Sequence, residues 1–270
     1  MEYIRTALFV PGTRIDRIEK AIATGADAVI VDLEDAVAAE SKEQARQALA
    51  DFLVAHPQVS VWVRINGIGT PWFTEDLAFC AAQTQITAIM LPKASSAGEV
   101  EQVAEIGKPV YPIIESAQGI VNIPSIAAVK GVVRLSFGAL DLGVDLGLDD
   151  DSEGAQILLN QMRVQMVVQS RAAGIAAPLD GVYPDFKNLE GIRQAMTLAK
   201  GMGFAGALCI HPTQVEIIHQ VMQPKDTEVA WAKAVLAKAE ETGLAAFAFE
   251  GKMVDLPVFE KARQILHRAG

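Results

Sequence analysis

Two carboxylates in this sequence follow apolar runs in a way that suits a divalent cation. Glu115 comes directly after the run 110–114, and Asp141 follows the run 132–137. If these runs are neighbouring strands of one barrel, their carboxyl ends meet at the same rim and the two side chains can converge there. Mg²⁺ binds oxygen ligands and retains several waters, so it needs only one or two protein carboxylates. The pair fits a Mg²⁺ site, and it equally fits two carboxylates that cap helices or pair with a lysine at the rim.

A single arginine lies inside an apolar stretch and needs an anionic partner. Arg64 stands within 62–66, where an unpaired guanidinium is energetically costly. Its partner is either a carboxylate of the acidic cluster Asp32, Glu34 and Asp35, or a substrate carboxylate gripped by two parallel hydrogen bonds. Arg64 can have both partners at once if a protein carboxylate holds one side of the guanidinium and the substrate carboxylate binds the other side. We interpret the acidic cluster as a support that holds the arginine, a nearby lysine or metal-bound water.

Lys93 and His211 each follow a further apolar run. Nothing near Lys93 would depress its pKa, so an electrostatic role beside carboxylates is favoured over a Schiff base. His211 suits either a hydrogen bond at the rim or a general base. Cys80 and Cys209 lie in apolar runs without a CxxC pair, which is typical of reduced core thiols. The sequence has no dinucleotide-binding glycine motif, Walker loop, serine nucleophile elbow or zinc-spaced cluster.

The elements that must position these residues are eight short apolar runs separated by amphipathic stretches. The runs are nearly continuous in apolar residues, as strands buried on both faces must be. They span 6–10, 28–33, 59–65, 86–91, 110–114, 132–137, 179–182 and 207–210. Eight alternating units with short linkers favour a closed (β/α)8 barrel, the TIM-barrel fold of the α/β class, over an open doubly wound sheet.

Helical periodicity fills the intervals between the runs. Clear examples are 15–23, 42–53, 99–106, 158–173 and 189–202. After the eighth run the rhythm changes, and the pattern predicts a helix at 227–243, a short apolar extension at 246–254 and a last helix at 256–269. We therefore expect a catalytic barrel domain over 1–223 and a C-terminal extension over 224–270 that acts as a lid.

The composition narrows the class of protein. The formal net charge of -10 argues against nonspecific binding to nucleic acid, which requires a basic surface. No apolar run approaches the roughly 18 residues of a membrane span, and the first residues lack the pattern of a secretory signal. We therefore expect a protein of the cytoplasm that binds neither nucleic acid nor membrane. A small anionic ligand remains compatible, because a few local cations can override the net charge.

Several stretches, taken together and in order, resemble one family. Residues 8–14 (LFVPGTR) and 25–37 (GADAVIVDLEDAV) look like the amino-terminal signature of citrate lyase beta subunit-like proteins, in the HpcH/HpaI aldolase superfamily. The similarity continues through further motifs along nearly the whole chain. They are 63–66, 91–93, 114–117, 137–138 with 141–142, 180–182 and 210–215.

The resemblance implies a (β/α)8 barrel that assembles as a homotrimer or hexamer and binds Mg²⁺ through Glu115 and Asp141. It implies that Arg64 grips a carboxylate or carbonyl of the substrate. In members that use coenzyme A, a C-terminal aspartate reaches the active site of the adjacent subunit, and Asp255 looks like that residue. We predict Asp255 and Arg64 as the catalytic residues. The residues predicted to bind substrate are Arg64, Glu115, Arg14, Lys93, Pro11 and Gly12.

The resemblance also implies the reaction. We expect a Mg²⁺-dependent carbon–carbon lyase that cleaves a β-hydroxy dicarboxylic acyl-CoA, of the (3S)-citramalyl-CoA or malyl-CoA type, to acetyl-CoA and a 2-oxo acid. One alternative is a citrate lyase beta subunit that acts on a citryl thioester of an acyl carrier protein. Another is a pyruvate-class aldolase that acts on free hydroxy-oxo acids. A catalytically silent binding subunit is disfavoured, because the predicted site residues are all present.

Overall fold

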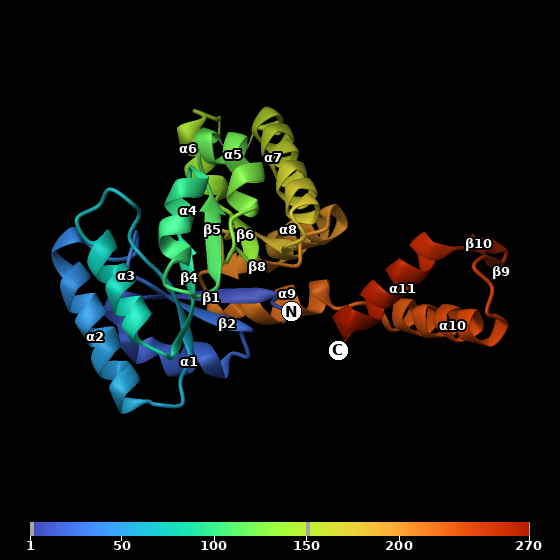
Figure 1. Cartoon of the computed structure of the whole chain (residues 1–270), viewed down its shortest axis with the longest axis horizontal. Helices are drawn as coiled ribbons and strands as arrows, with labels where there is room; N and C mark the ends of the chain where they lie inside the picture. The colour runs from blue at the N-terminus through green and yellow to red at the C-terminus, as the bar shows by residue number, and fades with distance from the viewer. Residues whose placement is uncertain (1–2, 150–151, 270) are drawn as a thin grey trace. The chain divides into compact units, whose positions relative to one another are not determined.

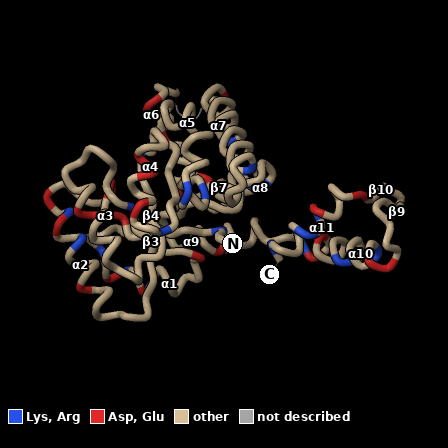
Figure 2. The backbone as a smooth tube through the Cα atoms, in the orientation of Figure 1, with Lys and Arg blue, Asp and Glu red and all other residues tan. Residues whose placement is uncertain are grey.

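The computed structural model describes residues 3–149 and 152–269. The chain divides into two compact units, Met1–His219 and Gln220–Gly270. Within the described residues, no helix has the length and apolarity that crossing a bilayer requires. Lys and Arg are interspersed with Asp and Glu along both units (Figure 2).

The first unit is a closed barrel of eight parallel strands joined in the order β1 to β8. The barrel is completed by pairing of β1 with β8, in which Ala7 is the neighbour of Leu208. The strands are β1 Thr6–Pro11, β2 Ala28–Asp32, β3 Val61–Arg64, β4 Ile86–Leu91, β5 Val110–Ile114, β6 Arg134–Phe137, β7 Ala176–Asp180 and β8 Gly206–Cys209. Figure 1 shows α-helices around these strands. The (β/α)8 barrel predicted from the apolar runs is confirmed.

Helices connect the strands and cover the barrel (Figure 1). They are α1 Ile18–Ala23, α2 Lys42–Ala55, α3 Phe73–Ala82, α4 Ala97–Ala104, α5 Ala117–Ala127, α6 Ala139–Asp145, α7 Glu153–Ala172, α8 Leu189–Met202 and α9 Pro212–Met222, with 3-10 turns η1 Gly12–Arg17 and η2 Ala39–Ser41. Polar residues fix where helices begin, because their side chains accept backbone N–H groups that have no partner within the helix. Ser96 and Glu99 form a capping box on α4, and Ser116 caps α5 by accepting the Gly119 N–H.

The barrel interior is a packed core. Its side chains come from the inward-facing positions of the strands, as the alternation of a pleated strand requires. Buried members include Ala7, Ile30, Trp62, Met90, Tyr111, Ile113, Leu179 and Leu208. Since apolar side chains fill the interior, the charged residues that follow the strands are left at the carboxyl rim.

The seventh strand starts earlier than the sequence predicts. The apolar run 179–182 indicates a strand there, but β7 occupies Ala176–Asp180 and includes Pro178. Its register against β6 shifts between the pairs Arg134–Ala176 and Ser136–Leu179, so β7 has one extra residue at this point. A proline lacks the N–H that a regular ladder needs and is tolerated at such a bulge. The proline therefore hid the first half of this strand from the pattern.

The C-terminal unit contains two helices and a β-hairpin. They are α10 Asp226–Thr242, β9 Phe247–Phe249, β10 Lys252–Val254 and α11 Leu256–Ala269. The helices predicted at 227–243 and 256–269 are present, and the apolar extension between them is the antiparallel hairpin. Val235 of α10, Val254 of β10 and Phe259 of α11 meet in a small core of their own.

Candidate active site

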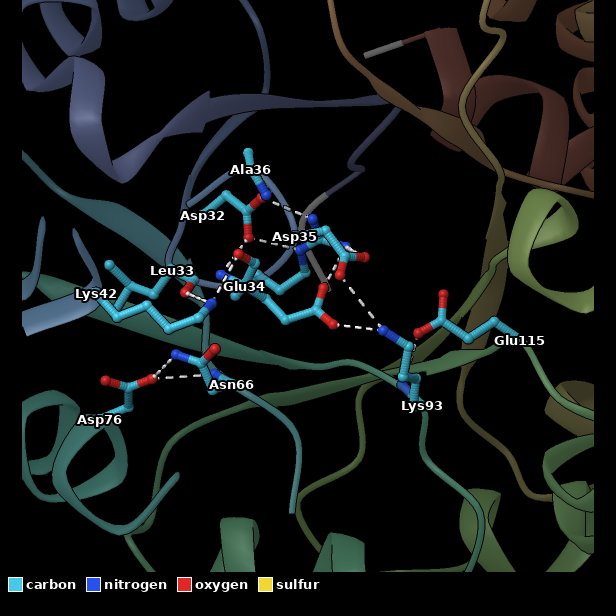
Figure 3. Close-up of polar contacts among 11 residues, drawn as sticks. Asp32, Leu33, Glu34, Asp35, Ala36, Lys42, Asn66, Asp76, Lys93 and Glu115 are labelled. Atoms are coloured by element: carbon cyan, nitrogen blue, oxygen red, sulfur yellow. Dashed lines mark hydrogen bonds and ion pairs between the residues drawn. The ribbon is translucent and has the colours of Figure 1, made fainter. Parts of the chain in front are cut away.

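The predicted site residues of the barrel lie at or just after the carboxyl ends of five successive strands. Asp32 and Arg64 are the last residues of β2 and β3, Lys93 comes two residues after the end of β4, and Glu115 directly follows β5. Asp141 lies in the first turn of α6, after β6. Figure 3 shows that several of these side chains form one connected polar network with Lys93.

Arg64 is held first of all by a protein carboxylate. It is the register neighbour of Asp32, and its Nε and one terminal nitrogen donate to the two Asp32 oxygens at 2.7 and 2.6 Å. Asp32 itself is fixed, because it also accepts the backbone N–H groups of Glu34 and Ala36. The guanidinium lies over the Phe9 ring with 4.8 Å between its carbon and the ring centroid. Asp32 thus holds one edge of the guanidinium from behind, as the sequence predicted for a carboxylate in the acidic cluster.

The other terminal nitrogen of Arg64 faces the rest of the acidic cluster. It lies 3.1 Å from Glu34 and 3.8 Å from Asp35. Burial disfavours a charged guanidinium, but the hydrogen bonds and charges of these carboxylates outweigh it and raise the pKa of Arg64. Arg64 therefore remains a cation at the rim, with its charge shared among three carboxylates.

Glu34 and Asp35 have opposite pKa shifts although they are adjacent. Burial raises the pKa of Glu34, and the opposing charges of Arg64 and Lys93 do not cancel that effect. Partial burial acts the same way on Asp35, but a hydrogen bond with Glu34 and the neighbouring cations lower its pKa. The Lys93 ammonium lies 2.6 Å from Glu34 and 3.5 Å from Asp35. The ammonium therefore bridges the two carboxylates.

Glu115 is the buried carboxylate of the site, with 5% of the residue exposed. One of its oxygens accepts the backbone N–H of Lys93 at 2.7 Å. Burial raises its pKa to about 7, helped by the negative charges of Asp141 and Glu34 and opposed by the Lys93 N–H. A carboxylate that is buried with so little compensation favours a positive partner.

The surroundings of Glu115 have the properties that Mg²⁺ requires. Asp141 is exposed, and its charge acts on Glu115. Gly138 leaves the space that the Glu115 carboxylate occupies, because a side chain at this glycine would overlap Glu115. Among the described residues, no cluster of three or more His, Cys, Asp or Glu is arranged to hold a metal. Two carboxylates, completed by water and substrate oxygens, are a donor set that fits Mg²⁺, whereas a cation that needs a full protein cage does not fit.

A hollow of about 470 Å³ lies beside the carboxyl ends of β1 and β8. Pro11 and Arg14 line it together with Arg17, Lys20 and His211. Arg14 is exposed, and the guanidinium forms a two-point ion pair with Asp16. Three cations and one anion, Asp16, line this hollow, which gives it a local positive charge in a chain whose net charge is negative.

Gly12 and His211 are held by local packing. A Cβ at Gly12 would come within 2.8 Å of the Asp32 carbonyl oxygen, so a glycine lets η1 pack against the end of β2. The His211 ring stacks on Phe186, and its Nδ1 accepts the Thr213 N–H at 3.3 Å. His211 is partly buried, and it forms a hydrogen bond at the rim, which is one of the two roles that the sequence left open for it.

Asp255 belongs to the C-terminal unit, where it lies between β10 and α11. Its carbonyl oxygen accepts the N–H groups of Val258 and Phe259 and so starts the final helix. Asp255 is partly buried within this unit.

One contributor to the site was not identified from the sequence. Lys42 begins α2, and its buried ammonium donates to the carbonyl oxygens of Leu33 and Glu34 at 2.9 Å each. It also lies over the Trp72 ring, 5.1 Å from the centroid. Lys42 thus fixes the backbone that presents the acidic cluster. The sequence contains no signal for this contact, since a lysine in the first turn of an amphipathic helix is ordinarily solvated.

Comparison with protein families gives a match over most of the barrel. The model described as HpcH/HpaI aldolase/citrate lyase matches residues 5–212. This chain belongs to that family. A second model, described as a C-C bond lyase of the TIM-barrel fold, matches residues 161–270. The chain is therefore a member of a family of carbon–carbon lyases built on this barrel, as the motifs predicted.

Individual relatives match over nearly the whole chain. A citrate lyase subunit beta-like protein of Mycobacterium tuberculosis is 40% identical over 97% of this chain and 94% of its own length. A (3S)-malyl-CoA thioesterase of Cereibacter sphaeroides is 35% identical over 98% of this chain and 94% of its own length. The crystal structure of CitE from M. tuberculosis, in complex with magnesium, acetoacetate and coenzyme A, superimposes with a TM-score of 0.86 at 36% identity, covering 99% of this chain and 98% of CitE.

Proposed function

We propose that the chain is a Mg²⁺-dependent lyase that cleaves a short β-hydroxy dicarboxylic acyl-CoA to acetyl-CoA and a 2-oxo acid. A (3S)-citramalyl or malyl group is the proposed acyl group. The observation that supports this proposal best is the buried carboxylate of Glu115, whose pKa is raised to about 7 beside Asp141. Lys93 donates its backbone N–H to Glu115 and its ammonium to Glu34, and so joins Glu115 to the acidic cluster around Arg64. The magnesium and coenzyme A in the similar CitE structure support the same choice of cofactor and substrate class.

In this proposal Glu115 and Asp141 hold Mg²⁺ and Arg64 holds the substrate carboxylate. When bound, Mg²⁺ supplies a Lewis acid toward the hydroxyl and carboxylate oxygens of the substrate. Asp32 keeps one edge of the Arg64 guanidinium occupied, so the terminal nitrogen that now faces Glu34 and Asp35 is the one that would bind the substrate carboxylate. Arg64 then stabilises the negative charge that develops on the oxygen as the hydroxyl becomes a carbonyl.

The bond changes balance without a further reactant. The hydroxyl proton passes to water, which returns a proton to the acid that protonates the product. The O–H electron pair forms the carbonyl as the bond between the hydroxyl-bearing carbon and the methylene carbon breaks. The electron pair of the broken bond stays on the methylene carbon as the enolate of the thioester. A proton added to that carbon gives the methyl group of acetyl-CoA. We assign this proton to Asp255 of the adjacent subunit in a homotrimer or hexamer, since a carboxyl that is dehydrated on closure is a competent acid.

The hollow beside β1 and β8 is the proposed site of the coenzyme A portion. Arg14, Arg17 and Lys20 provide the positive charge that its phosphates need, and Pro11 and Gly12 bring the backbone of η1 close to it. Lys93 borders the acyl site from the other side through Glu34 and Asp35. Enzyme of this kind is expected in the cytoplasm, where acyl-CoA substrates are available.

The proposal is tested with a panel of substrates and the purified chain. Citramalyl-CoA, malyl-CoA, citryl-CoA, a citryl thioester of acyl carrier protein and a free hydroxy-oxo acid are each incubated with Mg²⁺ or with EDTA. The 2-oxo acid, acetyl-CoA and free coenzyme A are then measured. Equal release of 2-oxo acid and acetyl-CoA from a CoA ester, only with Mg²⁺, is the expected result.

Other outcomes of the panel identify the alternatives. Activity on the carrier-protein thioester alone would support a citrate lyase beta subunit, and cleavage of the free acid would support an aldolase. Release of free coenzyme A without acetyl-CoA would indicate thioester hydrolysis, the activity that the C. sphaeroides relative is named for. Each of these results would overturn the proposed reaction.

A further inference from the structure

Lys93 has a backbone conformation that lysine rarely adopts. Its φ is +52°, and the only other non-glycine residue with a positive φ among the described residues is Glu250. Glu250 shares the two-residue turn between β9 and β10 with Gly251, where a hairpin requires positive φ. Lys93 lies in no such hairpin. Because left-handed backbone is unfavourable for a residue with a Cβ, contacts around Lys93 must maintain it.

The backbone of Lys93 contacts Glu115. The Lys93 N–H donates to a Glu115 oxygen at 2.7 Å, and the next residue, Ala94, donates to the carbonyl oxygen of Ile113 at 3.2 Å. These two bonds attach the loop after β4 to the end of β5. The left-handed turn therefore directs an amide at the carboxylate that we assign to Mg²⁺.

The side chain of Lys93 contacts the acidic cluster instead of Glu115. The ammonium donates to Glu34 at 2.6 Å, and the other Glu34 oxygen lies 3.1 Å from Arg64. Figure 3 shows Lys93 between Glu115 and the acidic cluster. The Lys93 ammonium is half-exposed, whereas the Glu34 side chain is buried. The contact therefore serves mainly to hold Glu34 in place.

We propose that Lys93 is a positioning residue that fixes Glu115 through its left-handed backbone and Glu34 through its ammonium. One residue thereby sets the separation between the metal carboxylate and the guanidinium that binds substrate. This inference rests on the proposed function, because it concerns the same Mg²⁺ site. It predicts that disturbing the Lys93 backbone affects Mg²⁺ binding, whereas removing the Lys93 ammonium affects substrate binding.

Substitutions at Lys93 separate the backbone from the ammonium. Lys93→Asn and Lys93→Gly remove the charge but tolerate positive φ, whereas Lys93→Val removes the charge and strongly disfavours it. Mg²⁺ affinity of the metal-free protein is measured by calorimetry, and kcat and KM are measured with the best thioester. Glu250→Val is the matched control, since it disturbs the only other such backbone in the described chain. Urea unfolding identifies any variant that has lost its fold.

Lys93→Asn and Lys93→Gly are expected to bind Mg²⁺ within about threefold of the wild-type Kd while KM rises about tenfold, as Glu34 and Arg64 lose their alignment. Lys93→Val is expected to weaken Mg²⁺ binding about tenfold or more, and Glu250→Val to leave it unchanged. If folded Lys93→Val binds Mg²⁺ as tightly as Lys93→Gly, the backbone role is refuted. If KM is unchanged in Lys93→Asn, the side-chain role is refuted. Failure of the wild type to bind Mg²⁺ would instead refute the proposed function and this inference with it.

Discussion

The carboxylate at one end of the barrel, Asp27, is partly buried, and the one at the other end, Glu115, is buried, and their pKa values shift in opposite directions. Asp27, just before β2, accepts the backbone N–H groups of Arg5 and Thr6 at 2.8 and 2.9 Å, and it also contacts the His219 ring at 3.0 Å. Burial acts to raise its pKa, but these donors outweigh burial and lower it. Glu115, at the carboxyl end, accepts one backbone N–H, and burial raises its pKa to about 7.

The difference shows which carboxylate is complete without a ligand. Asp27 is saturated by protein donors and ties β1, β2 and α9 together, which is a stabilising role. Glu115 accepts one backbone N–H and lies beside a second negative charge, so its donors do not outweigh the effect of burial on its pKa. A carboxylate that the fold buries without compensation marks a binding site, because a cation or substrate supplies the missing interaction.

Removing either carboxylate of the proposed metal site should have the largest effect. Glu115→Gln and Asp141→Asn each delete one of two anionic ligands, so turnover should fall roughly 1000-fold or more, equivalent to about 4 kcal/mol of transition-state stabilisation. The measurement is 2-oxo acid release at saturating Mg²⁺. Turnover at the wild-type rate in either folded variant would rule out the assignment of these ligands.

Asp255→Ala should lower kcat by roughly 100-fold, the scale for loss of a general acid, while Mg²⁺ affinity stays unchanged. Mixing Asp255→Ala with Glu115→Gln subunits should restore part of the activity if the acid comes from the adjacent subunit. Subunit exchange is verified by mass spectrometry with isotopically labelled chains. Exchanged oligomers that are no more active than the separate variants would contradict the arrangement in trans.

Arg64→Lys should lower kcat/KM by on the order of tenfold or more. The planar guanidinium has two edges, and Asp32 occupies one of them, whereas an ammonium cannot hold a carboxylate on both sides. Circular dichroism and urea unfolding check that the variant is folded. Near-normal kcat/KM would show that Arg64 serves only as the structural partner of Asp32.

The stability of the metal-free protein should depend on pH through Glu115. Its pKa is about 7 in the folded chain, above the ordinary value of 4.5. The folded state thus holds more protons than the unfolded state between these values, so the contribution of Glu115 to stability is greatest below about pH 4.5 and is lost as pH rises through 7. The unfolding free energy of Glu115→Gln minus that of the wild type should rise by up to about 3 kcal/mol from pH 4.5 to 8. A flat difference would contradict the raised pKa.

Asp27→Asn should lower the stability of the protein and leave its turnover unchanged, whereas Glu115→Gln should lower turnover. The Asp27→Asn change leaves backbone N–H groups and the His219 ring with a weaker acceptor, so the unfolding free energy should fall by about 2 kcal/mol. Urea denaturation measures this change, and 2-oxo acid release from the folded variant should equal that of the wild type. Loss of turnover without loss of stability would remove the distinction between the two ends.

Much of the fold and part of the site follow from the sequence for physical reasons. Strands buried on both faces produce continuous apolar runs, so all eight strands could be located, and a residue after such a run must lie at the carboxyl rim. The need of Arg64 for a carboxylate follows likewise, since it lies in an apolar stretch, but the sequence left Asp32, Glu34 and a substrate carboxylate open as partners. The register of β2 against β3 places Asp32 beside Arg64.

The contacts that depend on backbone direction could not be predicted. The left-handed turn at Lys93 and its amide bond to Glu115 leave no trace in residue type, because lysine gives no sign of positive φ. The reach of Lys42 to two carbonyl oxygens is equally hidden. Pro178 is a residue type that disfavours a regular strand, yet it lies within β7. Residue types thus predict which groups arrive at the rim, while hydrogen bonds between loops determine how they are held.

Calorimetric titration of Mg²⁺ into metal-free wild type, Glu115→Gln and Asp27→Asn measures whether cation binding depends on Glu115. The wild type and the less stable Asp27→Asn should each bind one Mg²⁺ per chain with the same Kd, and Glu115→Gln should show no binding at the same concentrations. Binding to Glu115→Gln with the wild-type Kd would contradict the account, because the cation would then not depend on the carboxylate that the barrel leaves uncompensated.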